Sequence, residues 1–492
     1  MKRFAKAIAL FSAGSVIGTL TQVAKGKLGA VLLGPEGTGV LNQLTNAWNL
    51  LYSLAGLGFY NGIVRRIAEA RSTDDREALV RQLSTSLIFL TVVASLGATA
   101  SVALAQPISN ALFADGGQHA SLVAITLISV PLAIMAQTYR GLLSGCQLVR
   151  PIVTAQVVSD VLGLALFVIL VLRLNLFGAA LAFSGLQLLK LMLQIATVRR
   201  ALPGTAILPR AATFSWREVG TNAGYGINGL FMVAVGVLTI VIVSRWIIAS
   251  RGLGANGIFS VAWKVSSVYF GAIYSSASSF YFPSLVACRD EDLQARINEA
   301  ISLYFYLLPP LIITLMALGD DLMALLFSAE FGPAAALLLL LLPGDLFRVL
   351  AEAMGMAFLA RRRLLAYTLT YVLWASAFLA LSGILLPRYA LMGVAGAYLA
   401  SQALSAAAVY LCARHTFSFK FAGPSLRAMA AGILAVALAA GALSQAPAPL
   451  WRYALGAAVL AIWFGLAWTD PRFRDLAAQG WARLLRRRAV LP

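Results

Sequence analysis

The chain has 492 residues, of which 60% are hydrophobic and only 12% are charged, and its mean hydropathy is +0.84. Because a soluble domain needs about 25% charged residues to cover its surface, this composition excludes the soluble classes of enzyme. The formal net charge of +19 could suggest nucleic acid, but basic residues in so apolar a chain first report membrane topology. We therefore expect no nucleic-acid partner.

Apolar runs separated by charged or turn-rich breaks predict an all-α polytopic membrane protein with about fourteen transmembrane helices. The first run follows Lys2 and Arg3 and lacks a short apolar region with a cleavage site, so we expect it to remain as the first span. The predicted helices cover residues 7–33, 38–62, 82–105, 120–146, 152–172, 177–198, 219–247, 257–286, 298–319, 336–358, 367–386, 392–413, 428–445 and 452–469.

Two short motifs recur at matching places in the two halves of the chain. Leu33–Gly37, between the first two predicted helices, is similar to Leu253–Gly257, between the seventh and eighth. Arg173–Ala180, between the fifth and sixth, is similar to Arg388–Ala395, between the eleventh and twelfth. The offsets of 220 and 215 residues indicate an internal repeat of two six-helix lobes with a central cleft, an arrangement that many transporters use.

This repeat predicts four parts along the chain. They are an N-terminal six-helix lobe at 1–200, a cytoplasmic linker at 201–218, a C-terminal six-helix lobe at 219–415, and two additional helices with a basic cytoplasmic tail at 416–492.

The orientation follows from the lysines and arginines between the predicted helices. One side of the membrane receives 27 of the 38, the other side receives four, and seven lie within helices. Since lysine and arginine are retained in cytoplasmic loops, both termini are predicted to be cytoplasmic. The three cysteines, Cys146, Cys288 and Cys412, then lie at cytoplasmic helix ends, where thiols stay reduced. Neither a metal nor a cofactor is expected.

Cations inside the predicted helices are candidate ligands for an anion. A charge in a bilayer span costs at least about 2.5–3.5 kcal/mol, so it usually faces a cavity or a partner. Lys25 and Lys27 on the first helix and Lys264 on the eighth are predicted in corresponding outer halves, and Arg140 lies near the inner end of the fourth. We interpret them, with Arg348, as a cationic cavity for phosphate or diphosphate. The alternatives are snorkelling to lipid headgroups and, for Arg140, a structural contact.

Two groups of charged residues are candidates for ion coupling or for locking the lobes. Asp345, Arg348 and Glu352 on the tenth predicted helix share one face, because they are three and four residues apart. Arg348 can neutralise one carboxylate and leave the other for a proton or cation. Asp160 and Lys190, on the fifth and sixth helices, have similar depth and are interpreted as an intramembrane ion pair.

A path for sugars needs aromatic faces and polar partners, which the second and eighth predicted helices carry. The alternative is ordinary helix packing and aromatic belts at the membrane interface. The candidates are Asn42, Gln43, Trp48, Tyr52, Trp263 and Tyr274.

Enzyme signatures are absent from the sequence. There is no phosphate-binding Walker loop, and the two histidines, His119 and His415, are predicted on opposite sides of the membrane. The outer loops are too short for an external catalytic domain, the longest being 106–119 and 320–335. We therefore expect a transporter rather than an enzyme.

Several segments carry a resemblance to a known family. Leu32–Gly39, Gly58–Val64 and Gly344–Arg348 resemble the Wzx-type polysaccharide flippases of the MOP exporter superfamily, as does Phe282–Leu285 with the charged loop that follows it. The similarity covers most of residues 5–415. Proteins of this type translocate lipid-linked oligosaccharides in O-antigen and enterobacterial-common-antigen pathways.

The resemblance implies that the chain moves an undecaprenyl-diphosphate-linked oligosaccharide from the cytoplasmic to the outer leaflet of a bacterial inner membrane. Its implied partners are that substrate, membrane lipids, a polysaccharide polymerase and chain-length proteins. A lipid II-type flippase is the next alternative, because that branch also has two extra helices, although Ala24–Leu28 replaces its arginine-rich first-helix pattern. A MATE-like exporter and a membrane glycosyltransferase or polymerase are the remaining alternatives.

Overall fold

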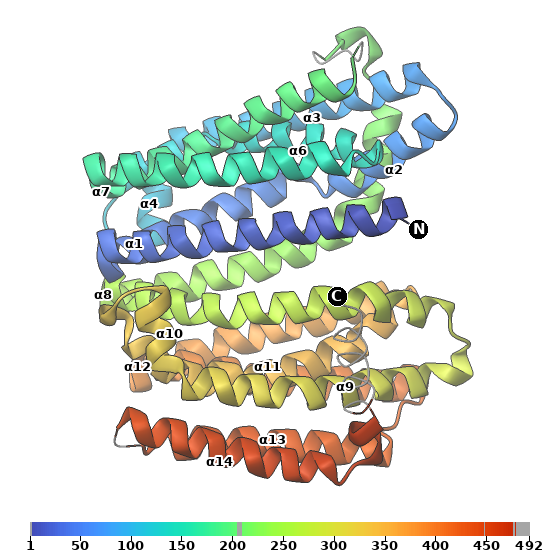
Figure 1. Ribbon diagram of the computed structural model, residues 1–492. Coiled ribbons are helices and arrows are strands. Elements are labelled where there is room, and N and C mark those ends of the chain that lie inside the picture. The colour runs from blue at the N-terminus through green and yellow to red at the C-terminus, as the bar shows by residue number, and fades with distance from the viewer. Residues whose placement is uncertain (1, 204–208, 447, 476–477, 479–492) are drawn as a thin grey trace, which may run out of the picture. The chain divides into compact units, whose positions relative to one another are not determined.

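The computed structural model describes residues 2–203, 209–446, 448–475 and 478. The described residues form helices and connecting segments (Figure 1). The elements are α1 (Lys2–Gly56), α2 (Phe59–Ser72), α3 (Arg76–Ala103), α4 (Ala105–Phe113), α5 (Ala120–Leu127), α6 (Val130–Gly145), α7 (Val149–Ala201), η1 (Ala211–Thr213), α8 (Trp216–Ala287), α9 (Asp290–Ala317), α10 (Gly319–Leu326), η2 (Ala329–Phe331), α11 (Pro333–Ala360), α12 (Leu364–Phe417), α13 (Gly423–Ser444) and α14 (Pro449–Trp468).

The chain is an all-α, multi-pass membrane protein, as predicted. Within the described residues, ten helices are long and apolar enough to cross a membrane. Four of these, α1, α7, α8 and α12, each contain one non-helical residue at which two helices meet. The breaks fall between predicted helices that the sequence analysis separated. The count of about fourteen spans stays a prediction.

The four breaks form two pairs with matching backbone geometry. Gly34 and Gly252 have φ/ψ values of 64°/−171° and 86°/173°, a region that is essentially restricted to glycine. Asn175 and Ala390 have values of 49°/−129° and 52°/−140°. The members of each pair are 218 and 215 residues apart. The second value equals the offset of its sequence motif, and the first is two residues smaller than the motif offset of 220. This agreement supports the internal repeat.

The two longest predicted outer loops are partly helical. The short helix α4 lies within the expected loop 106–119, and α10 and η2 lie within or beside 320–335. Because α4 and α10 precede α5 and α11 in equivalent places, they extend the repeat to elements that the hydropathy pattern did not separate.

The hairpins of α1 and α8 approach each other backbone to backbone beside their glycine breaks. A methyl group on Gly39 would overlap the carbonyl oxygen of Leu253, and one on Gly257 would overlap the carbonyl oxygen of Pro35. The side chain of Asn256 donates a hydrogen bond to the Gly39 carbonyl at 3.1 Å. The approach is reciprocal, as expected for two repeat-related hairpins, and only residues without a side chain fit there.

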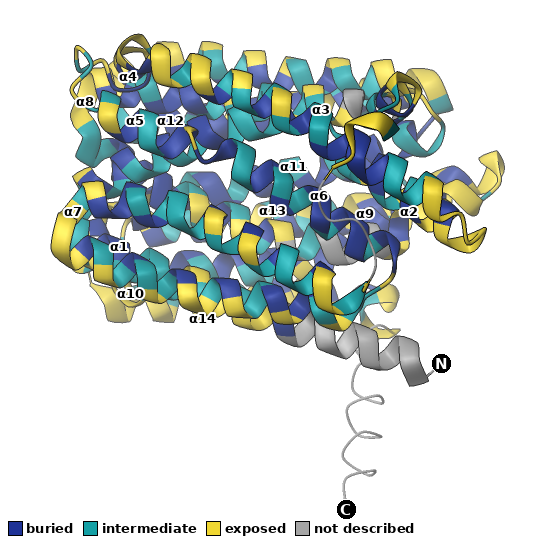
Figure 2. Cartoon of the chain, turned by 90° about the horizontal axis from the view of Figure 1, so that it is seen from above, coloured by how far each residue is buried: buried dark blue, intermediate teal, exposed yellow. Residues whose placement is uncertain are grey.

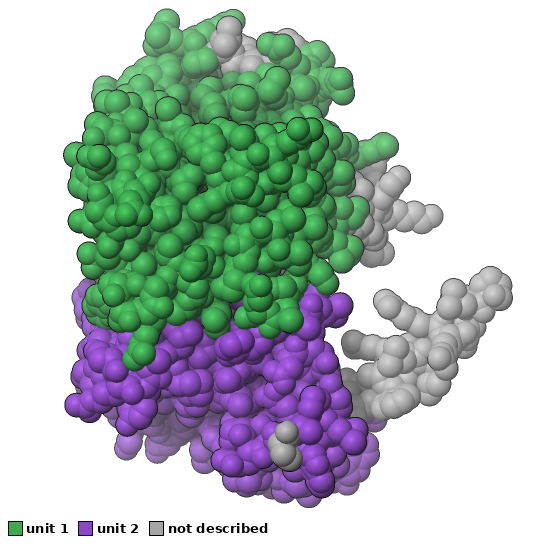
Figure 3. All heavy atoms as spheres, turned by 90° about the vertical axis from the view of Figure 1, so that its left-hand side faces the viewer, with its two compact units in different colours: residues 1–258, 326–330 green, residues 259–325, 331–492 purple. Residues whose placement is uncertain are grey.

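The chain divides into two compact units (Figure 3). The first unit comprises Met1–Ile258 and Leu326–Glu330, and the second comprises Phe259–Leu325 and Phe331–Pro492. The division at Ile258 lies inside α8. The predicted lobes, with their boundary in 201–218, rest on the sequence repeat and stay a prediction.

Several described helices, α3 among them, carry buried residues on one face and exposed residues on another (Figure 2). On α3, Leu87 and Leu90 are buried, whereas Val92 and Leu96 are 52% and 67% exposed. Large exposed apolar side chains of this kind match a lipid environment, because hydrocarbon solvates them without cost.

In the second unit, a row of polar side chains on α9 holds the two additional helices. Asn298 donates to the carbonyl of Lys420 at 3.0 Å, Ser302 shares a hydrogen bond with Ser425 at 3.0 Å, and the Tyr306 hydroxyl donates to Asp470 at 2.8 Å. The three α9 residues are four apart and therefore share one face. These hydrogen bonds thus fasten the two additional helices to α9 at the end where α13 begins and α14 ends.

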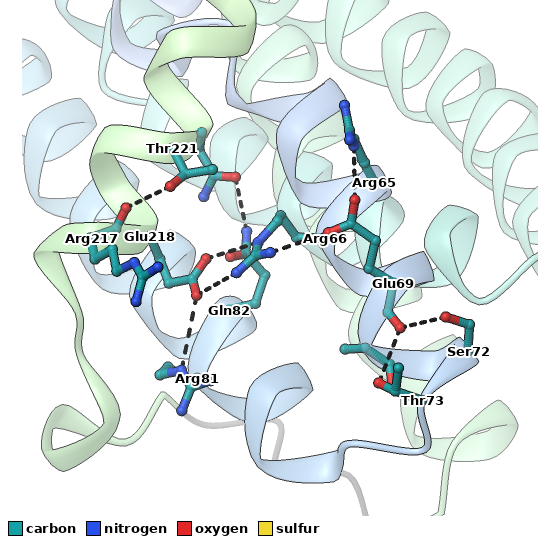
Figure 4. Close-up of polar contacts among 12 residues, drawn as sticks. Arg65, Arg66, Glu69, Ser72, Thr73, Arg81, Gln82, Arg217, Glu218 and Thr221 are labelled. Carbon is teal, nitrogen blue, oxygen red and sulfur yellow. Dashed lines mark hydrogen bonds and ion pairs between the residues drawn. The ribbon is translucent and has the colours of Figure 1, made fainter.

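An ion-pair cluster fastens the start of α8 to α2 and α3 within the first unit (Figure 4). Arg66 donates from two nitrogens to both oxygens of Glu218, at 2.8 and 3.1 Å, and this hydrogen bonding raises the pKa of Arg66. A nitrogen of Arg81 lies 4.0 Å from the same carboxylate. One turn further along α8, Asn222 accepts a hydrogen bond from Gln82 at 3.2 Å. The Glu218 carboxylate of α8 therefore pairs with one arginine from α2 and one from α3.

We expect Glu218→Gln to lower the thermal unfolding midpoint of the purified protein. The Glu218 side chain is only 8% exposed, and hydrogen bonds to a charged group contribute about 1.5–3 kcal/mol. The matched control is Glu69→Gln, which removes an acid that pairs with Arg65 and Arg66 but is 46% exposed. Exposed pairs contribute about 0–1 kcal/mol. Equal midpoints for the two variants would contradict this interpretation of the cluster.

Candidate functional site

A cavity of about 600 Å³ lies in the first unit, lined by α1, α2, α6 and α7. Its lining is polar for a site inside apolar helices: it includes six amide side chains, three cations and one carboxylate. The amides are those of Gln22, Asn49, Gln137, Gln156, Gln187 and Gln194.

The cavity brings together residues that the sequence analysis assigned to three separate roles. Lys25 and Arg140 were predicted to bind an anion, Trp48 and Tyr52 to line a sugar path, and Asp160 with Lys190 to form an ion pair. All six line this one cavity.

Lys25 is held against aromatic rings. Its ammonium nitrogen lies 5.0 Å from the centre of the Phe167 ring and 5.9 Å from that of Phe183, distances typical of cation–π contacts. Such contacts hold the ammonium group beside the aromatic rings. Lys27, two residues along the same helix, was predicted to belong to the cationic cavity with Lys25, but it does not line this cavity. The reason is that side chains two residues apart on a helix point in different directions.

Arg140 and Asp160 are connected through an amide. Arg140 donates to the Gln156 carbonyl oxygen at 3.3 Å, and the Gln156 nitrogen donates to both Asp160 oxygens at 3.0 and 2.9 Å. Asp160 makes no ion pair within 4.0 Å with Lys190 or Arg140. Lys190 lines the same cavity as Asp160 and lies within the range of an electrostatic interaction with it, so their predicted pairing stays a prediction.

The formal charges of the lining do not balance. Lys25, Arg140 and Lys190 carry three positive charges and Asp160 carries one negative charge, which leaves two positive charges in excess. An excess of buried positive charge is costly in a low-dielectric site unless an anion accompanies it.

One wall of the cavity is aromatic. The indole nitrogen of Trp48 donates to the Ser129 hydroxyl at 3.0 Å, which fixes the ring. Tyr52 stacks on it with centroids 4.7 Å apart and an interplanar angle of 11°, and Phe183 meets it edge-on at 5.3 Å. Aromatic faces beside amide and hydroxyl groups are suited to bind sugars.

Asn42 and Gln43 do not join this wall. Neither lines the cavity, and Gln43 is fully buried, with its amide nitrogen donating to the carbonyls of Leu112 and Val241 at 3.2 and 3.1 Å. Gln43 therefore joins α1 to α4 and α8, which is a structural role.

The second unit holds the other predicted residues, and Asp345 is the centre of their network. Its carboxylate is completely buried and accepts hydrogen bonds from Ser266 at 2.8 Å, Tyr269 at 2.6 Å and Tyr398 at 2.7 Å. Trp263 packs edge-on against Tyr398, with centroids 5.1 Å apart. Asp345 is thus bound by hydroxyl groups from α8 and α12.

Arg348 and Glu352 share the α11 face with Asp345, and Arg348 lies within the range of an electrostatic interaction with both carboxylates. Which of the two carboxylates it neutralises stays a prediction. The Arg348 guanidinium stacks on Phe270, 3.9 Å from the ring centre. Glu352 accepts a hydrogen bond from Tyr367 at 3.2 Å. Among the described residues, no ion pair within 4.0 Å involves these three α11 side chains.

The remaining predicted residues lie on α8 in the second unit. Lys264 has an exposed side chain, and its expected convergence with Lys25 stays a prediction. Tyr274 stacks on Phe270 with ring centroids 6.0 Å apart.

Sequence reasoning missed the residues that organise both networks. In the first unit these are the cavity amides, Gln156 above all, and in the second they are Ser266, Tyr367 and Tyr398. The available signal was an uncharged polar side chain inside an apolar run, which is too common among helix-packing residues to single out one position.

Removing the Asp345 carboxylate should destabilise the second unit. Asp345→Ala leaves three buried hydroxyl donors without their acceptor, and each unsatisfied buried donor costs about 1–3 kcal/mol. We expect a clear drop in the thermal unfolding midpoint, whereas Asp321→Ala, which removes an exposed acceptor of the Tyr453 hydroxyl, should change it little. An unchanged midpoint for Asp345→Ala would show that the network contributes no stability.

Comparison with known proteins gives one family. The model of a family described as "Polysaccharide biosynthesis protein" matches residues 9–288. Among curated proteins, the chain is 23% identical over 384 residues to the lipid III flippase of Escherichia coli (strain K12), an alignment that covers 76% of this chain and 90% of that protein. The lipid III flippase of Shigella flexneri matches with the same identity and coverage.

Two solved structures show the same fold. The lipid II flippase MurJ, in an inward closed conformation, is 13% identical with a TM-score of 0.74, and the match covers 95% of this chain and 100% of that one. A multidrug resistance MATE family transporter of the MOP superfamily, in an inward-facing conformation, is 16% identical with a TM-score of 0.68 over 84% of this chain and 98% of that one. At these identities the likeness concerns the fold.

Proposed function

This chain belongs to the polysaccharide biosynthesis protein family, and from that premise we propose that it is a flippase for a polyisoprenyl-diphosphate-linked oligosaccharide. It carries the substrate from the cytoplasmic to the outer leaflet by alternating access. The cell-surface polysaccharide that it serves is of the O-antigen, common-antigen or exopolysaccharide type, and a polysaccharide polymerase and chain-length proteins take up the product.

The observation that carries this proposal is the charge of the cavity in the first unit. A diphosphate that joins a lipid to a sugar bears two negative charges, and the lining has an excess of two positive charges. Arginine and lysine bind phosphate through charge-assisted hydrogen bonds, which are stronger than neutral ones. The aromatic wall of Trp48 and Tyr52, together with the amides, suits the sugar next to the diphosphate.

A lipid II-type substrate is the second candidate. It is supported by the two additional helices α13 and α14 and by the likeness to the lipid II flippase fold over 95% of this chain. A MATE-like exporter of cationic drugs would need an excess of carboxylates, which the cavity in the first unit does not have. Transport rather than catalysis agrees with the relatives, which are described as flippases and transporters.

We assign ion coupling to Asp345 in the second unit. A fully buried carboxylate surrounded by three hydroxyl groups can take up a proton or a small cation, because hydroxyl oxygens can turn from donor to ligand. If transport is driven by a proton or sodium gradient rather than by downhill flux, the coupling ion would bind at Asp345 and not in the cationic cavity.

Substitution of Lys25 tests the proposal. Lys25→Ala should reduce the transfer of a fluorescent polyprenyl-diphosphate-linked saccharide across proteoliposomes by about 10-fold, because a charge-assisted contact of about 1.5–3 kcal/mol is lost. Lys27→Ala is the matched control, since Lys27 lies on the same helix outside the cavity lining, and it should retain most of the activity. Wild-type transfer by Lys25→Ala at normal abundance would exclude the cationic-cavity mechanism.

The proposed orientation places both termini in the cytoplasm of a bacterium, with the chain in its inner membrane. The basis is the distribution of 27 and four lysines and arginines on the two sides. Reporter fusions should show the outer side after Gln106, Arg173 and Arg251, and the cytoplasmic side after Arg71, Arg210 and Arg362. A single fusion on the wrong side is enough to reject this topology.

A further inference from the structure

A single amide separates the arginine of the cavity from its carboxylate. Gln156 and Asp160 are four residues apart on α7 and share one face, while Arg140 comes from α6. The Gln156 oxygen accepts from Arg140 at 3.3 Å, and its nitrogen donates to the two Asp160 oxygens at 3.0 and 2.9 Å. The Gln156 amide thus accepts a hydrogen bond from the cation and donates hydrogen bonds to the anion.

A direct contact between Arg140 and Asp160 would have a different effect. Arginine and carboxylate commonly form two parallel hydrogen bonds, and such a fork occupies the donors of the guanidinium and neutralises its charge. In this structure the guanidinium gives one hydrogen bond to a neutral oxygen and makes no other hydrogen bond in the described part of the chain. Since arginine has five N–H donors, most of them remain for a ligand in the cavity.

We infer that Gln156 is a positioning residue for the anionic group of the substrate. It orients the Arg140 guanidinium toward the cavity and prevents Asp160 from neutralising it, so that the charge stays available for a diphosphate. The inference rests on the proposed function, because it takes a diphosphate as the ligand. Gln156 carries no charge itself and acts through its contact with the Arg140 guanidinium.

Gln156 is suited to this role by its chemistry and length. A carboxylate at the same position would pair with Arg140 and cancel its charge. An apolar side chain would leave Arg140 and Asp160 without the intervening hydrogen bonds, and the two would be free to pair directly. An amide remains neutral while its oxygen accepts from Arg140 and its nitrogen, a separate atom, donates to Asp160.

The test uses the purified full chain in lipid nanodiscs and measures binding of farnesyl diphosphate by calorimetry. Gln156→Leu should weaken binding by about 10-fold, as expected when a charge-assisted contact is lost. Asp160→Asn should strengthen binding, because it removes a negative charge from the cavity. The double variant Gln156→Leu with Asp160→Asn should bind with an affinity close to that of Asp160→Asn, because Arg140 then has no carboxylate to pair with.

This rescue separates positioning from a purely structural role, because a folding defect caused by Gln156→Leu would persist in the double variant. A charge control accompanies it. Gln156→Glu and Asn49→Asp add the same negative charge to the same cavity lining, but only the first places it against Arg140. Gln156→Glu should therefore weaken binding more than Asn49→Asp does.

The outcomes distinguish the two proposals. The role of Gln156 is overturned if Gln156→Leu binds with wild-type affinity, or if the double variant binds as weakly as Gln156→Leu. The proposed function still holds in that case if Lys25→Ala loses affinity. If the wild-type protein does not bind farnesyl diphosphate and Lys25→Ala transports normally, both the proposed function and the inference fail.

Discussion

The cost of placing charge inside a bilayer is the constraint on which the rest of this structure depends. With only 12% charged residues in the chain, each charge within a span must face a cavity, a partner or a ring. Lys25 lies against Phe167 and Phe183, Arg348 stacks on Phe270, and Asp345 is bound by hydroxyl groups. The first unit thus keeps an excess of positive charge open to a cavity, while the second buries a carboxylate.

This difference between the units is the basis of the proposed division of labour. The repeat gives both halves the same backbone breaks, at Gly34 and Gly252 and at Asn175 and Ala390, yet it does not give them the same polar residues. A cationic cavity suits an anionic substrate, and a hydroxyl-bound carboxylate suits a proton or small cation. Equivalent backbones with different side chains therefore allow one half to bind cargo and the other to bind the coupling ion.

Much of the fold could be predicted from the sequence. Apolar run lengths predicted an all-α membrane protein, and the motif Leu33–Gly37 contains the break at Gly34, whose backbone region requires glycine. The break at Gly252 lies just before the related motif Leu253–Gly257. The short helices α4 and α10 were missed, since eight or nine residues are too few to produce a separate hydropathy signal. The breaks at Asn175 and Ala390 lie inside the motifs Arg173–Ala180 and Arg388–Ala395, but neither residue has a signature that predicts a break there.

The candidate site was predictable in part. Charged residues stand out in an apolar sequence, so Lys25, Arg140, Asp160 and Lys190 could be named, but nothing in the sequence showed that they line one cavity. The hydrogen-bond partner of each charge could not be predicted, because spacing along a helix does not fix where a long side chain ends. The neutral residue Gln156 determines how two of them are connected, and an amide within a span carries no signal that distinguishes this role from ordinary helix packing.

The central claim is that the cavity of the first unit receives the diphosphate of a lipid-linked sugar. A structure of the protein determined with a bound polyprenyl-diphosphate-linked saccharide would test this claim most directly. The account predicts diphosphate oxygens within hydrogen-bond distance of the Lys25 ammonium and the Arg140 guanidinium, with the first sugar beside Trp48 and Tyr52. A diphosphate bound without contact to either cation would contradict it.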